Sequence, residues 1–459
     1  MFLPLHRIKT IAVQNSAIPL ELSFSLWEKV ARSGRMRVHF LPSPGASRHP
    51  LPKGEGHARN RFANRESHET RRKRNEASNP SLFEMCYKCG LFMTKLLILS
   101  SDTGEGHNSA AIAIAYAARA GGLQVTIRRP LEESTSVNRS LANFYNTLLT
   151  HRPQWMGWYF RLINTARPNE REFFYSRVRS YIGRFIESEK PGILLSVHPM
   201  LNHFIQRFIK EERLGIPCYT YLTDPFPPFW HGWISPHIDR YFVPTDEALD
   251  ALVGRGIPAR RIERVPMPVR PGFVPAAMKD IDGLREVLKL DGSSSILING
   301  GARGGGPIFQ VYRTIRKCAG AANILVVCGR NGRLRRRIER LQDGRTRAFG
   351  FLEDIHRYVA ASDLVVTKPG GLSSYEALAC EVPVLLMGMR GLMPQESGLF
   401  RASSRYDFGF AARTFEELRA IIQKGPAEWN LKRQALSRFY KSSSGVELIE
   451  RIQPEHVRA

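Results

Sequence analysis

The sequence predicts an α/β protein with two parallel-sheet domains that face each other across a central cleft. Residues 96–111 (LLILSSDTGEGHNSAA) and 363–379 (DLVVTKPGGLSSYEALA) each give an apolar strand, a glycine-containing turn and a helix. Such a unit places backbone N–H groups and the positive end of a helix at the carboxyl edge of a parallel sheet. Because the two units lie in separate arrays of strands and helices, we expect one such edge on each side of the cleft.

Strands and helices alternate from residue 95 onward, which indicates parallel sheets covered on both faces. In the first array we expect strands at residues 96–100, 125–128, 193–197, 219–223 and 240–243, with helices at 109–120, 138–189 and 246–253. In the second array we expect strands at 296–299, 323–328, 347–351, 364–367 and 384–387, with helices at 307–319, 332–342, 355–361, 372–380, 415–423 and 429–440.

The first 92 residues differ from the rest in composition. They hold 16 Lys and Arg against 7 Asp and Glu and contain a long stretch rich in Pro, Gly, Ser and Asn. Such a stretch buries too little apolar area to offset chain entropy. We therefore expect a disordered basic extension or a spurious one, with the folded protein starting near Met93.

The net charge of +25 predicts attraction to an anionic partner such as phosphorylated substrates or an acidic membrane surface. No apolar run approaches the ~20 residues that span a bilayer. Four of the six cysteines lie in or beside predicted core elements, which favours a reducing compartment, and Cys86 and Cys89 form an isolated pair that is more simply incidental than a metal site. The sequence therefore predicts a cytoplasmic protein with peripheral membrane contact.

The first glycine turn offers a candidate general base. Gly104 and Gly106 permit a tight bend and close approach by a ligand, and His107 follows at the expected helix start. The helix dipole would lower the pKa of this histidine and favour the neutral imidazole that a base requires. A capping residue without chemistry is the alternative.

Two later turns are suited to phosphate groups. Residues 300–306 (GGARGGG) follow a strand and precede a helix, so Gly301 and Gly304 would expose N–H donors and Arg303 could add a bidentate contact. Residues 367–374 (TKPGGLSS) form the second turn, in which Gly370 and Gly371 free the backbone. Its side chains Lys368 and Ser373 would add a charge and a hydroxyl.

Three polar side chains near these turns are candidates for sugar recognition. Glu376 is expected in the first turn of the following helix, where it could accept ribose hydroxyls or only favour the helix dipole. Gln395 and Glu396 follow the next strand, where such a pair could bind several hydroxyls of a sugar.

Together these segments resemble a known family. The motifs that carry the resemblance are GEGHNSAA, LTDPFPPFWHGWISPHIDRYFVPT (residues 222–245), PVRPGF (268–273), CGRN (328–331), TKPGGLSSYEALA and PQESG (394–398). These motifs, in this order, resemble the monogalactosyldiacylglycerol synthase family, which includes processive diacylglycerol glucosyltransferases. The sequence departs from the family at Leu399, where Asn is common, and in PFPPFWH (225–231), which replaces a histidine-rich stretch.

The resemblance implies a GT-B fold with two Rossmann-like domains and an inverting transfer from a UDP-hexose without a catalytic metal or other cofactor. Residues 93–265 would form the acceptor and membrane domain, 266–275 a linker, 276–425 the UDP-sugar domain and 426–459 closing helices. The two glycine turns would hold the diphosphate, Phe351 would lie near the uracil, Glu376 would bind ribose, and Gln395 with Glu396 would bind the hexose. His107 would be the base, with Asp224 the alternative.

A lipid acceptor, diacylglycerol or a relative, is expected on the inner face of the cell membrane. Aromatic and basic side chains mixed in one helical region suit an interface with anionic headgroups. We expect the acceptor and membrane contacts at Gly104, Gly106, Trp155, Trp158, Tyr159, Arg161 and Trp230. A glycosyltransferase with a soluble acceptor, a UDP-sugar epimerase and a noncatalytic membrane or nucleic-acid binder remain as alternatives, although nucleic acid is disfavoured because no recognised motif for it is present.

Overall fold

The computed structural model describes residues 95–103, 105–151, 155–274, 281–290, 292–341, 343–389, 391–439 and 445–453. All of them lie in the second of the two units into which the chain divides, residues 86–459. The predicted basic extension, the Cys86–Cys89 pair and Gly104 lie outside the described residues.

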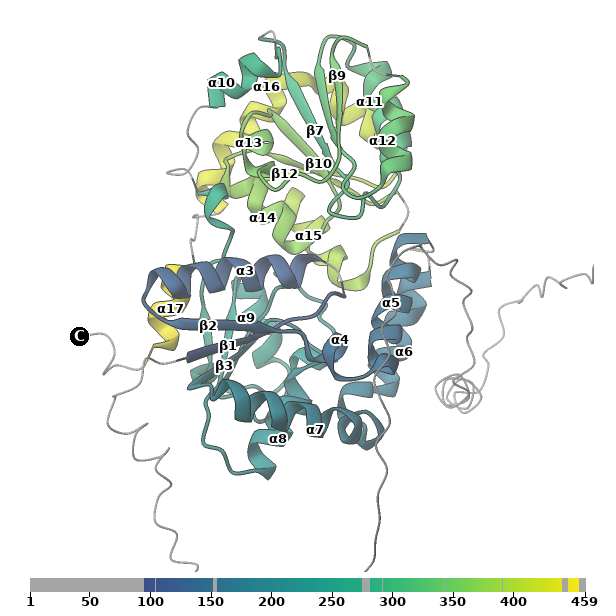
Figure 1. The fold of residues 1–459 in the computed structure, drawn as a ribbon. Coiled ribbons are helices and arrows are strands. Elements are labelled where there is room, and N and C mark those ends of the chain that lie inside the picture. Colours follow the sequence, from purple (N-terminus) through teal and green to yellow (C-terminus); the bar gives the residue numbers. More distant parts are fainter. Residues whose placement is uncertain are drawn as a thin grey trace, which may run out of the picture. The chain divides into compact units, whose positions relative to one another are not determined.

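The first lobe is built on a six-stranded parallel sheet with the order β2-β1-β3-β4-β5-β6 (Figure 1). Its strands are β1 (Lys95–Leu99), β2 (Gln124–Arg128), β3 (Ile193–Ser196), β4 (Cys218–Tyr221), β5 (Arg240–Val243) and β6 (Ile262–Arg264). Its helices are α3 (Glu105–Ala120), α4 (Pro130–Ser134), α5 (Ser136–His151), α6 (Met156–Ala166), α7 (Glu172–Glu189), α8 (Asn202–Glu211) and α9 (Asp246–Val253). Short 3-10 turns are η2 (Pro168–Glu170), η3 (His231–Trp233), η4 (Ala259–Arg261) and η5 (Pro271–Phe273).

The second lobe has a six-stranded parallel sheet with the order β12-β11-β10-β7-β8-β9. Its strands are β7 (Ser295–Asn299), β8 (Asn323–Val327), β9 (Thr346–Phe349), β10 (Leu364–Thr367), β11 (Val384–Met387) and β12 (Gly409–Ala412). Its helices are α10 (Ile281–Val287), α11 (Ile308–Cys318), α12 (Gly332–Glu339), α13 (Ile355–Ala360), α14 (Gly371–Ala379), α15 (Pro394–Arg405) and α16 (Phe415–Phe439). The two predicted parallel-sheet domains are therefore confirmed.

Several elements differ from the sequence prediction. The region 138–189 is not one helix, because Arg167 adopts a left-handed conformation (φ 45°) at the end of α6 and Pro168 then opens η2. The two closing helices predicted at 415–423 and 429–440 are both present within α16, where a non-helical Gly425 (φ 76°) ahead of Pro426 separates them, but the second begins earlier than predicted. Strands β6 and β12, of three and four residues, were not predicted.

The C-terminal helix α17 (Val446–Ile452) returns to the first lobe. It packs against α3, and the Gln453 side-chain amide donates to the carbonyl oxygen of Gly121 at 3.3 Å. Gly445 precedes α17 with φ 81°, and a Cβ there would lie 3.1 Å from Cβ of Ala117. The segment after α16 therefore adds to the first lobe and not to the second.

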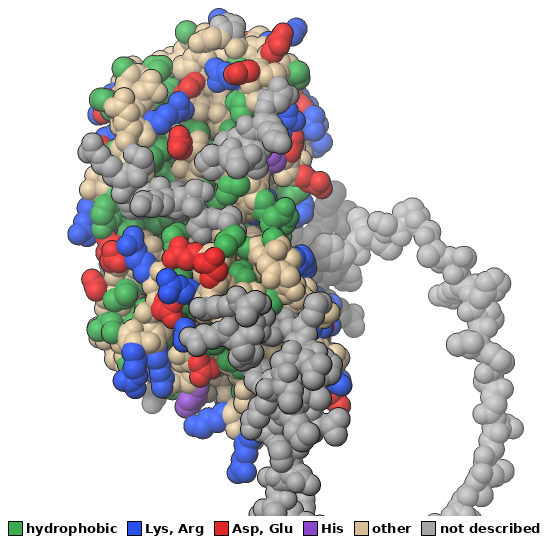
Figure 2. Space-filling model, turned by 90° about the vertical axis from the view of Figure 1, so that its left-hand side faces the viewer, with side chains coloured by type: hydrophobic (Ala, Val, Ile, Leu, Met, Phe, Trp, Pro, Cys, Tyr) green, Lys and Arg blue, Asp and Glu red, His purple; other side chains and the backbone are tan. Residues whose placement is uncertain are grey.

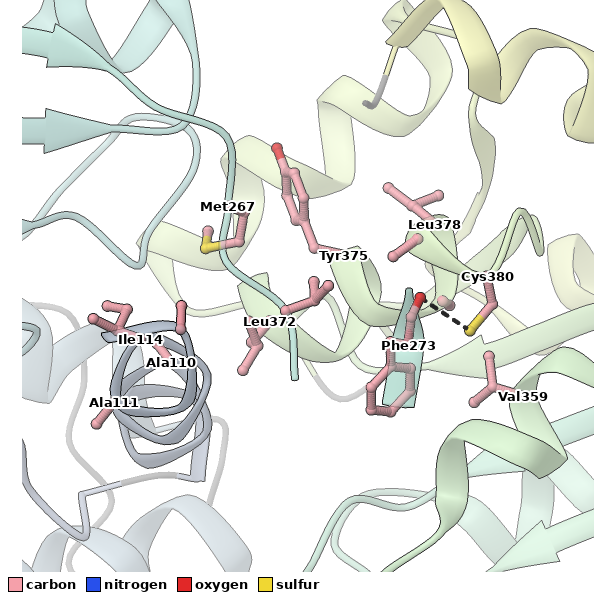
Figure 3. Packing of buried hydrophobic residues seen from close by; sticks show 14 of the residues in the cluster. Ala110, Ala111, Ile114, Met267, Phe273, Val359, Leu372, Tyr375, Leu378 and Cys380 are labelled. Atoms are coloured by element: carbon pink, nitrogen blue, oxygen red, sulfur yellow. Dashed lines mark hydrogen bonds between the residues drawn. The ribbon is translucent and has the colours of Figure 1, made fainter. Parts of the chain in front are cut away.

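Helices α3 and α14 bring the lobes together through small and apolar side chains. Figure 3 shows Ala110 and Ile114 of α3 beside Leu372 of α14, with Phe273 on the other side of α14. All four are buried in one apolar cluster. The alanines on α3 have small side chains, so α14 can approach it closely.

Charge on the surface is mixed. On the face drawn in Figure 2, Lys and Arg side chains are interspersed with acidic and apolar ones. Among the described residues, no helix combines the length and apolar character needed to cross a bilayer.

Candidate active site

Three loops of the first lobe converge on His107, the third residue of α3. Its Nδ1 lies 2.8 Å from the carbonyl oxygen of Val197, which follows β3, and 2.9 Å from Oγ1 of Thr223, which follows β4. Because β1, β3 and β4 are parallel neighbours, their carboxyl ends meet at one edge of the sheet. The carbonyl oxygen can only accept, so Nδ1 carries the proton and Nε2 of the neutral ring keeps its lone pair.

Burial is the largest influence on the His107 imidazole. It lowers the pKa of His107, while the negative charge of Asp224 and the bond to Val197 oppose the change. The direction agrees with the sequence prediction, but the first cause is burial and not the helix dipole. The neutral imidazole with a free Nε2 is the form that a general base requires.

His198 lies beside His107 and was not predicted. The two rings meet edge to face with centroids 4.5 Å apart. Its Nδ1 accepts from the backbone N–H of Met200 at 3.3 Å, so Nε2 donates to Oγ1 of Thr103 at 2.6 Å. Burial, followed by the charge of His107, holds the pKa of His198 well below its usual value, so this ring stays neutral. Its place directly after β3, at the same sheet edge, is the signal that could have identified it.

Asp224 follows β4 and faces the same site. Its Oδ2 accepts a hydrogen bond from Nε1 of Trp233 at 2.7 Å. Burial raises the pKa of Asp224, whereas the charge of His107 and the Trp233 bond lower it. Trp233, a fully buried residue of η3, is a second side chain that sequence reasoning missed.

In the second lobe, the glycine loop after β7 is held in a tight turn. Gly301 and Gly304 have φ values of 69° and 60°, and the N–H of Gly301 donates to Oδ1 of Asn299 at 2.8 Å. A Cβ on Gly304 would lie 2.0 Å from the carbonyl oxygen of Cys328, so only glycine fits there. Arg303 is exposed at the turn. The predicted phosphate cradle is therefore a defined loop with closely packed backbone.

Lys368 connects the two predicted phosphate turns. Its Nζ lies 3.1 Å from the position of a Cβ on Gly305. Burial lowers the pKa of Lys368, while the charge of Glu396 opposes this change. An ammonium group at the junction of two glycine turns is placed to meet a diphosphate.

The second turn also touches the first lobe. Gly370 is the N-cap of α14, and a Cβ on Gly371 would lie 2.5 Å from the carbonyl oxygen of Thr223. The Thr223 side chain contacts His107, so one residue links the candidate base to the anion-binding turn. Ser373 is the third residue of α14 and does not cap it, because Gly370 is the cap.

Glu376 lies in the second turn of α14 and not in the first as predicted. Its carboxylate is paired with Arg270, with Nε to Oε1 at 2.6 Å and Nη2 to Oε2 at 3.1 Å. Burial raises the pKa of Glu376, and the charge and bonds of Arg270 oppose the rise. The sequence prediction had no partner for this carboxylate.

Gln395 and Glu396 lie in the first turn of α15. Oε2 of Glu396 accepts from the backbone N–H of Met393 at 2.9 Å, and burial raises the pKa of Glu396 to about 7. The amide of Gln395 donates to Sδ of Met393 at 3.6 Å, while its Oε1 is buried without a hydrogen-bond partner. An unsatisfied buried oxygen costs free energy until a donor such as a sugar hydroxyl reaches it.

Tyr145 of α5 brings a group from the first lobe to the Gln395–Glu396 turn. Its hydroxyl donates to Sδ of Met393 at 3.9 Å, and its ring lies 5.6 Å from that of Tyr159. Burial is the largest cause that raises the pKa of Tyr145, with Tyr159, Glu396 and Asp224 adding to it. His107 and Asp224 of the first lobe therefore lie near Lys368, Gly371 and Glu396 of the second, together with a tyrosine that was not among the predicted site residues.

Comparison with known proteins agrees with this arrangement. Residues 107–269, from the candidate base through Asp224 and Trp233, match the family model described as Monogalactosyldiacylglycerol (MGDG) synthase. The chain is 24% identical over 380 residues to the processive diacylglycerol beta-glucosyltransferase of Bacillus cytotoxicus, covering 79% of this chain and 94% of that protein. It is 28% identical over 315 residues to the chloroplastic monogalactosyldiacylglycerol synthase of Spinacia oleracea, covering 64% of this chain and 59% of the spinach protein. The chain is thus similar in sequence to the monogalactosyldiacylglycerol synthases and to the processive diacylglycerol glucosyltransferases.

A solved structure supports the fold. MurG of Acinetobacter baumannii matches with a TM-score of 0.54 at 14% sequence identity, covering 78% of this chain and 99% of that one. The GT-B fold expected from the resemblance is confirmed by this match and by the two parallel sheets.

The residues expected at an acceptor or membrane surface differ in their exposure. Trp155 and Trp158 are 58% and 59% exposed, and Arg161 and Gly106 are also exposed. Tyr159 is half-buried beside Tyr145. The membrane contact expected of Trp230 is wrong, because its side chain is only 5% exposed and its ring covers Gly232, where a Cβ would lie 2.4 Å from a ring carbon.

Phe351, expected near the uracil, is exposed after β9. The guanidinium carbon of Arg330 lies 4.9 Å from its ring centroid, and the ring itself is 48% exposed. Arg330, whose backbone N–H donates to the carbonyl oxygen of Ala302 at 2.8 Å, connects Phe351 with the glycine loop, and the position of Phe351 near the uracil stays a prediction.

Proposed function

We propose that this protein is an inverting glycosyltransferase that moves a hexose from a UDP-hexose to diacylglycerol or a related lipid. It would act peripherally on the inner face of the cell membrane. The names of its relatives support a hexose as the transferred group and diacylglycerol as the acceptor. The observation that carries the proposal is the contact of Thr223 with both His107 and Gly371, which joins a base to an anion-binding turn.

In this proposal His107 removes the proton from the acceptor hydroxyl. Its Nδ1–H is held by the carbonyl oxygen of Val197, so Nε2 is fixed in the unprotonated form. As the acceptor oxygen bonds to C1 of the hexose, the bond from C1 to the diphosphate oxygen breaks and the proton passes to Nε2. The charge of Asp224 stabilises the resulting imidazolium.

The departing UDP gains negative charge, which Lys368 and the backbone N–H groups of the two glycine turns are placed to stabilise. Preorganised donors of this kind act without reorganisation during the reaction. A helix end contributes roughly 0.3–2 kcal/mol, and several such groups acting together would replace a catalytic metal. Gln395 and Glu396 would hold the hexose hydroxyls.

A transfer assay tests the proposal directly. The purified chain is incubated with radiolabelled UDP-glucose or UDP-galactose and vesicles containing diacylglycerol, and the lipids are extracted into organic solvent. We expect label in the lipid product, with a β-linkage in its NMR spectrum. Label that stays in water-soluble products, or conversion of the UDP-sugar without an acceptor, would contradict the proposal.

The exposed aromatic side chains suit a membrane contact. Phe144, Trp155 and Trp158 of the α5–α6 region are 52–59% exposed, with Arg161 exposed on the same helix as Trp158. Burial of one large apolar side chain contributes about 1.5–3 kcal/mol, so each Trp should change partitioning about tenfold or more. Basic neighbours add about 1 kcal/mol each on anionic lipid.

Co-sedimentation with anionic vesicles tests this surface. The double variant Trp155→Ser and Trp158→Ser should bind vesicles at least about tenfold more weakly than the native chain. Leu431→Ser is the matched control, because Leu431 is 56% exposed on α16 of the other lobe. Equal loss in both variants, or no loss in either, would exclude α6 as the membrane contact.

A further inference from the structure

Two histidines and a carboxylate meet on the first lobe, in a cluster that the transfer mechanism does not use. Glu170 of η2, His203 of α8 and His231 of η3 each offer one ligand atom, and these atoms lie within 4.8 Å of one another. Nε2 of His231 lies 2.5 Å from Oε1 of Glu170, and Nε2 of His203 lies 3.7 Å from the same oxygen. The two rings are stacked with centroids 6.4 Å apart.

The protein holds these three side chains from several directions. Oδ1 of Asn164 accepts from the backbone N–H of His231 at 3.1 Å. The Asn202 amide donates to the carbonyl oxygens of Gly232 and Trp233, both at 3.3 Å, so η3 is fixed against the start of α8. Residues 170, 203 and 231 are far apart in the chain, and the half-buried Asn164 and the buried Asn202 hold the η3 turn against α6 and α8.

We propose that Glu170, His203 and His231 form a binding site for a divalent transition-metal ion of the zinc type. Two imidazole nitrogens and one carboxylate oxygen are a ligand set that zinc accepts, with water in the fourth position. Ligand atoms about 2.0–2.2 Å from a tetrahedral ion lie about 3.3 Å apart, so on binding the widest pair closes by at most about 1.5 Å and the His231–Glu170 pair, now 2.5 Å apart, opens by about 0.8 Å. Side-chain rotation supplies a movement of this size.

Binding exchanges protons for metal bonds. Nε2 of His231 now shares its proton with Glu170, and Nε2 of His203 donates to the carbonyl oxygen of Ile234 at 2.9 Å. When the ion takes the Nε2 lone pair of a neutral ring, the proton of that ring moves to Nδ1 and the hydrogen bond from Nε2 is lost. A ring protonated on both nitrogens must release one proton to solvent before it can bind the ion, so binding weakens at acidic pH. Nη1 of Arg167 lies 3.6 Å from Oε2 of Glu170, so its positive charge is close to the proposed ion and shares the same carboxylate.

A metal here fixes a segment that matters to the active site. His231 and Trp233 belong to the same turn η3, and Trp233 donates to Asp224. The ion ties this turn to η2 and α8, so its role is structural and separate from the transfer step. It differs from a catalytic metal, because the ligands lie outside the group formed by His107, Asp224 and Lys368.

The test measures metal binding, not activity. The full chain with Cys86→Ser and Cys89→Ser, which removes a second possible zinc site, is stripped with chelator and titrated with Zn²⁺ by calorimetry. We expect one ion per chain and a rise in Tm. Co²⁺ should give the visible absorption of a tetrahedral site with nitrogen and oxygen ligands.

Single substitutions then locate the ion. His203→Gln, His231→Gln and Glu170→Gln should each weaken Zn²⁺ binding at least about tenfold and abolish the rise in Tm. His237→Gln is the control, because His237 is an exposed histidine of the same lobe outside the cluster. In chelator, each variant must have the same Tm as the metal-free native chain, which shows that it is folded. If a histidine variant unfolds, Glu170→Gln carries the test in its place. Absence of Zn²⁺ binding, or binding that survives all three substitutions, overturns the proposal.

Discussion

The hydrogen bond from Trp233 to Asp224 provides a direct test of how the site controls its protons. Trp233→Phe keeps a buried aromatic ring but removes the N–H that lies 2.7 Å from Oδ2 of Asp224. Burial already raises the pKa of Asp224 and this bond lowers it. Removing the bond should therefore raise the pKa further.

The size of the shift follows from the strength of the bond. A hydrogen bond to a charged group contributes about 1.5–3 kcal/mol, and one pKa unit corresponds to about 1.4 kcal/mol. The pKa of Asp224 should rise by about 1–2 units. A carboxyl group with a higher pKa loses its charge at a higher pH during acidification, so activity that needs the carboxylate is lost at a higher pH as well.

The assay is the pH dependence of kcat/KM for lipid glycosylation. In Trp233→Phe we expect the acidic limb of the profile to move to higher pH by about 1–2 units. Trp230→Phe is the matched control, because Nε1 of Trp230 is buried without a hydrogen-bond partner. An unshifted limb in Trp233→Phe, or the same shift in both variants, would refute the assignment of this bond.

Four further outcomes are expected. His107→Gln should lower kcat about 10²–10⁴-fold while UDP binding, followed by titration, is unchanged. Glu396→Gln should raise KM for the UDP-hexose above the Glu396 pKa of about 7 and less below it, where the native carboxyl group is also protonated. Gly371→Ala places a Cβ 2.5 Å from the Thr223 carbonyl oxygen and should raise donor KM, at a cost of about 1–3 kcal/mol, whereas Gly320→Ala, with nothing within 4 Å, should not. Arg270→Met leaves the Glu376 carboxylate unpaired and should lower the free energy of unfolding in urea by about 3 kcal/mol.

Local sequence patterns were sufficient for most of the fold. Apolar strands followed by glycine turns and helices predicted both parallel sheets, because each element has its own periodicity. Strands β6 (Ile262–Arg264) and β12 (Gly409–Ala412) escaped because three or four residues with charges, Gly or Ala carry no clear alternation. The return of α17 to α3 could not be predicted, because contacts between distant helices leave no local signal.

The candidate site residues also divide into those that local sequence predicts and those that it does not. Residues in strand-to-helix turns, such as His107 and Lys368, could be assigned to the site because the carboxyl edge of a parallel sheet gathers them. Trp233 and Tyr145 were missed because their roles depend on contacts made across the fold, whereas His198 was overlooked although it directly follows a predicted strand. The membrane contact expected of Trp230 was wrong because composition alone does not distinguish a buried tryptophan from an exposed one.

The pairing of Arg270 with Glu376 bears on how the second lobe could hold a ribose. Displacing Arg270 would leave a buried charge, at a cost of about 3–5 kcal/mol, more than one or two sugar hydrogen bonds return. A carboxylate has about four acceptor positions, however, and the bidentate guanidinium uses two of them. Glu376 could therefore accept ribose hydroxyls while it stays paired. Arg270, which lies in the linker between the lobes, would then orient the carboxylate and connect donor binding to the position of the lobes.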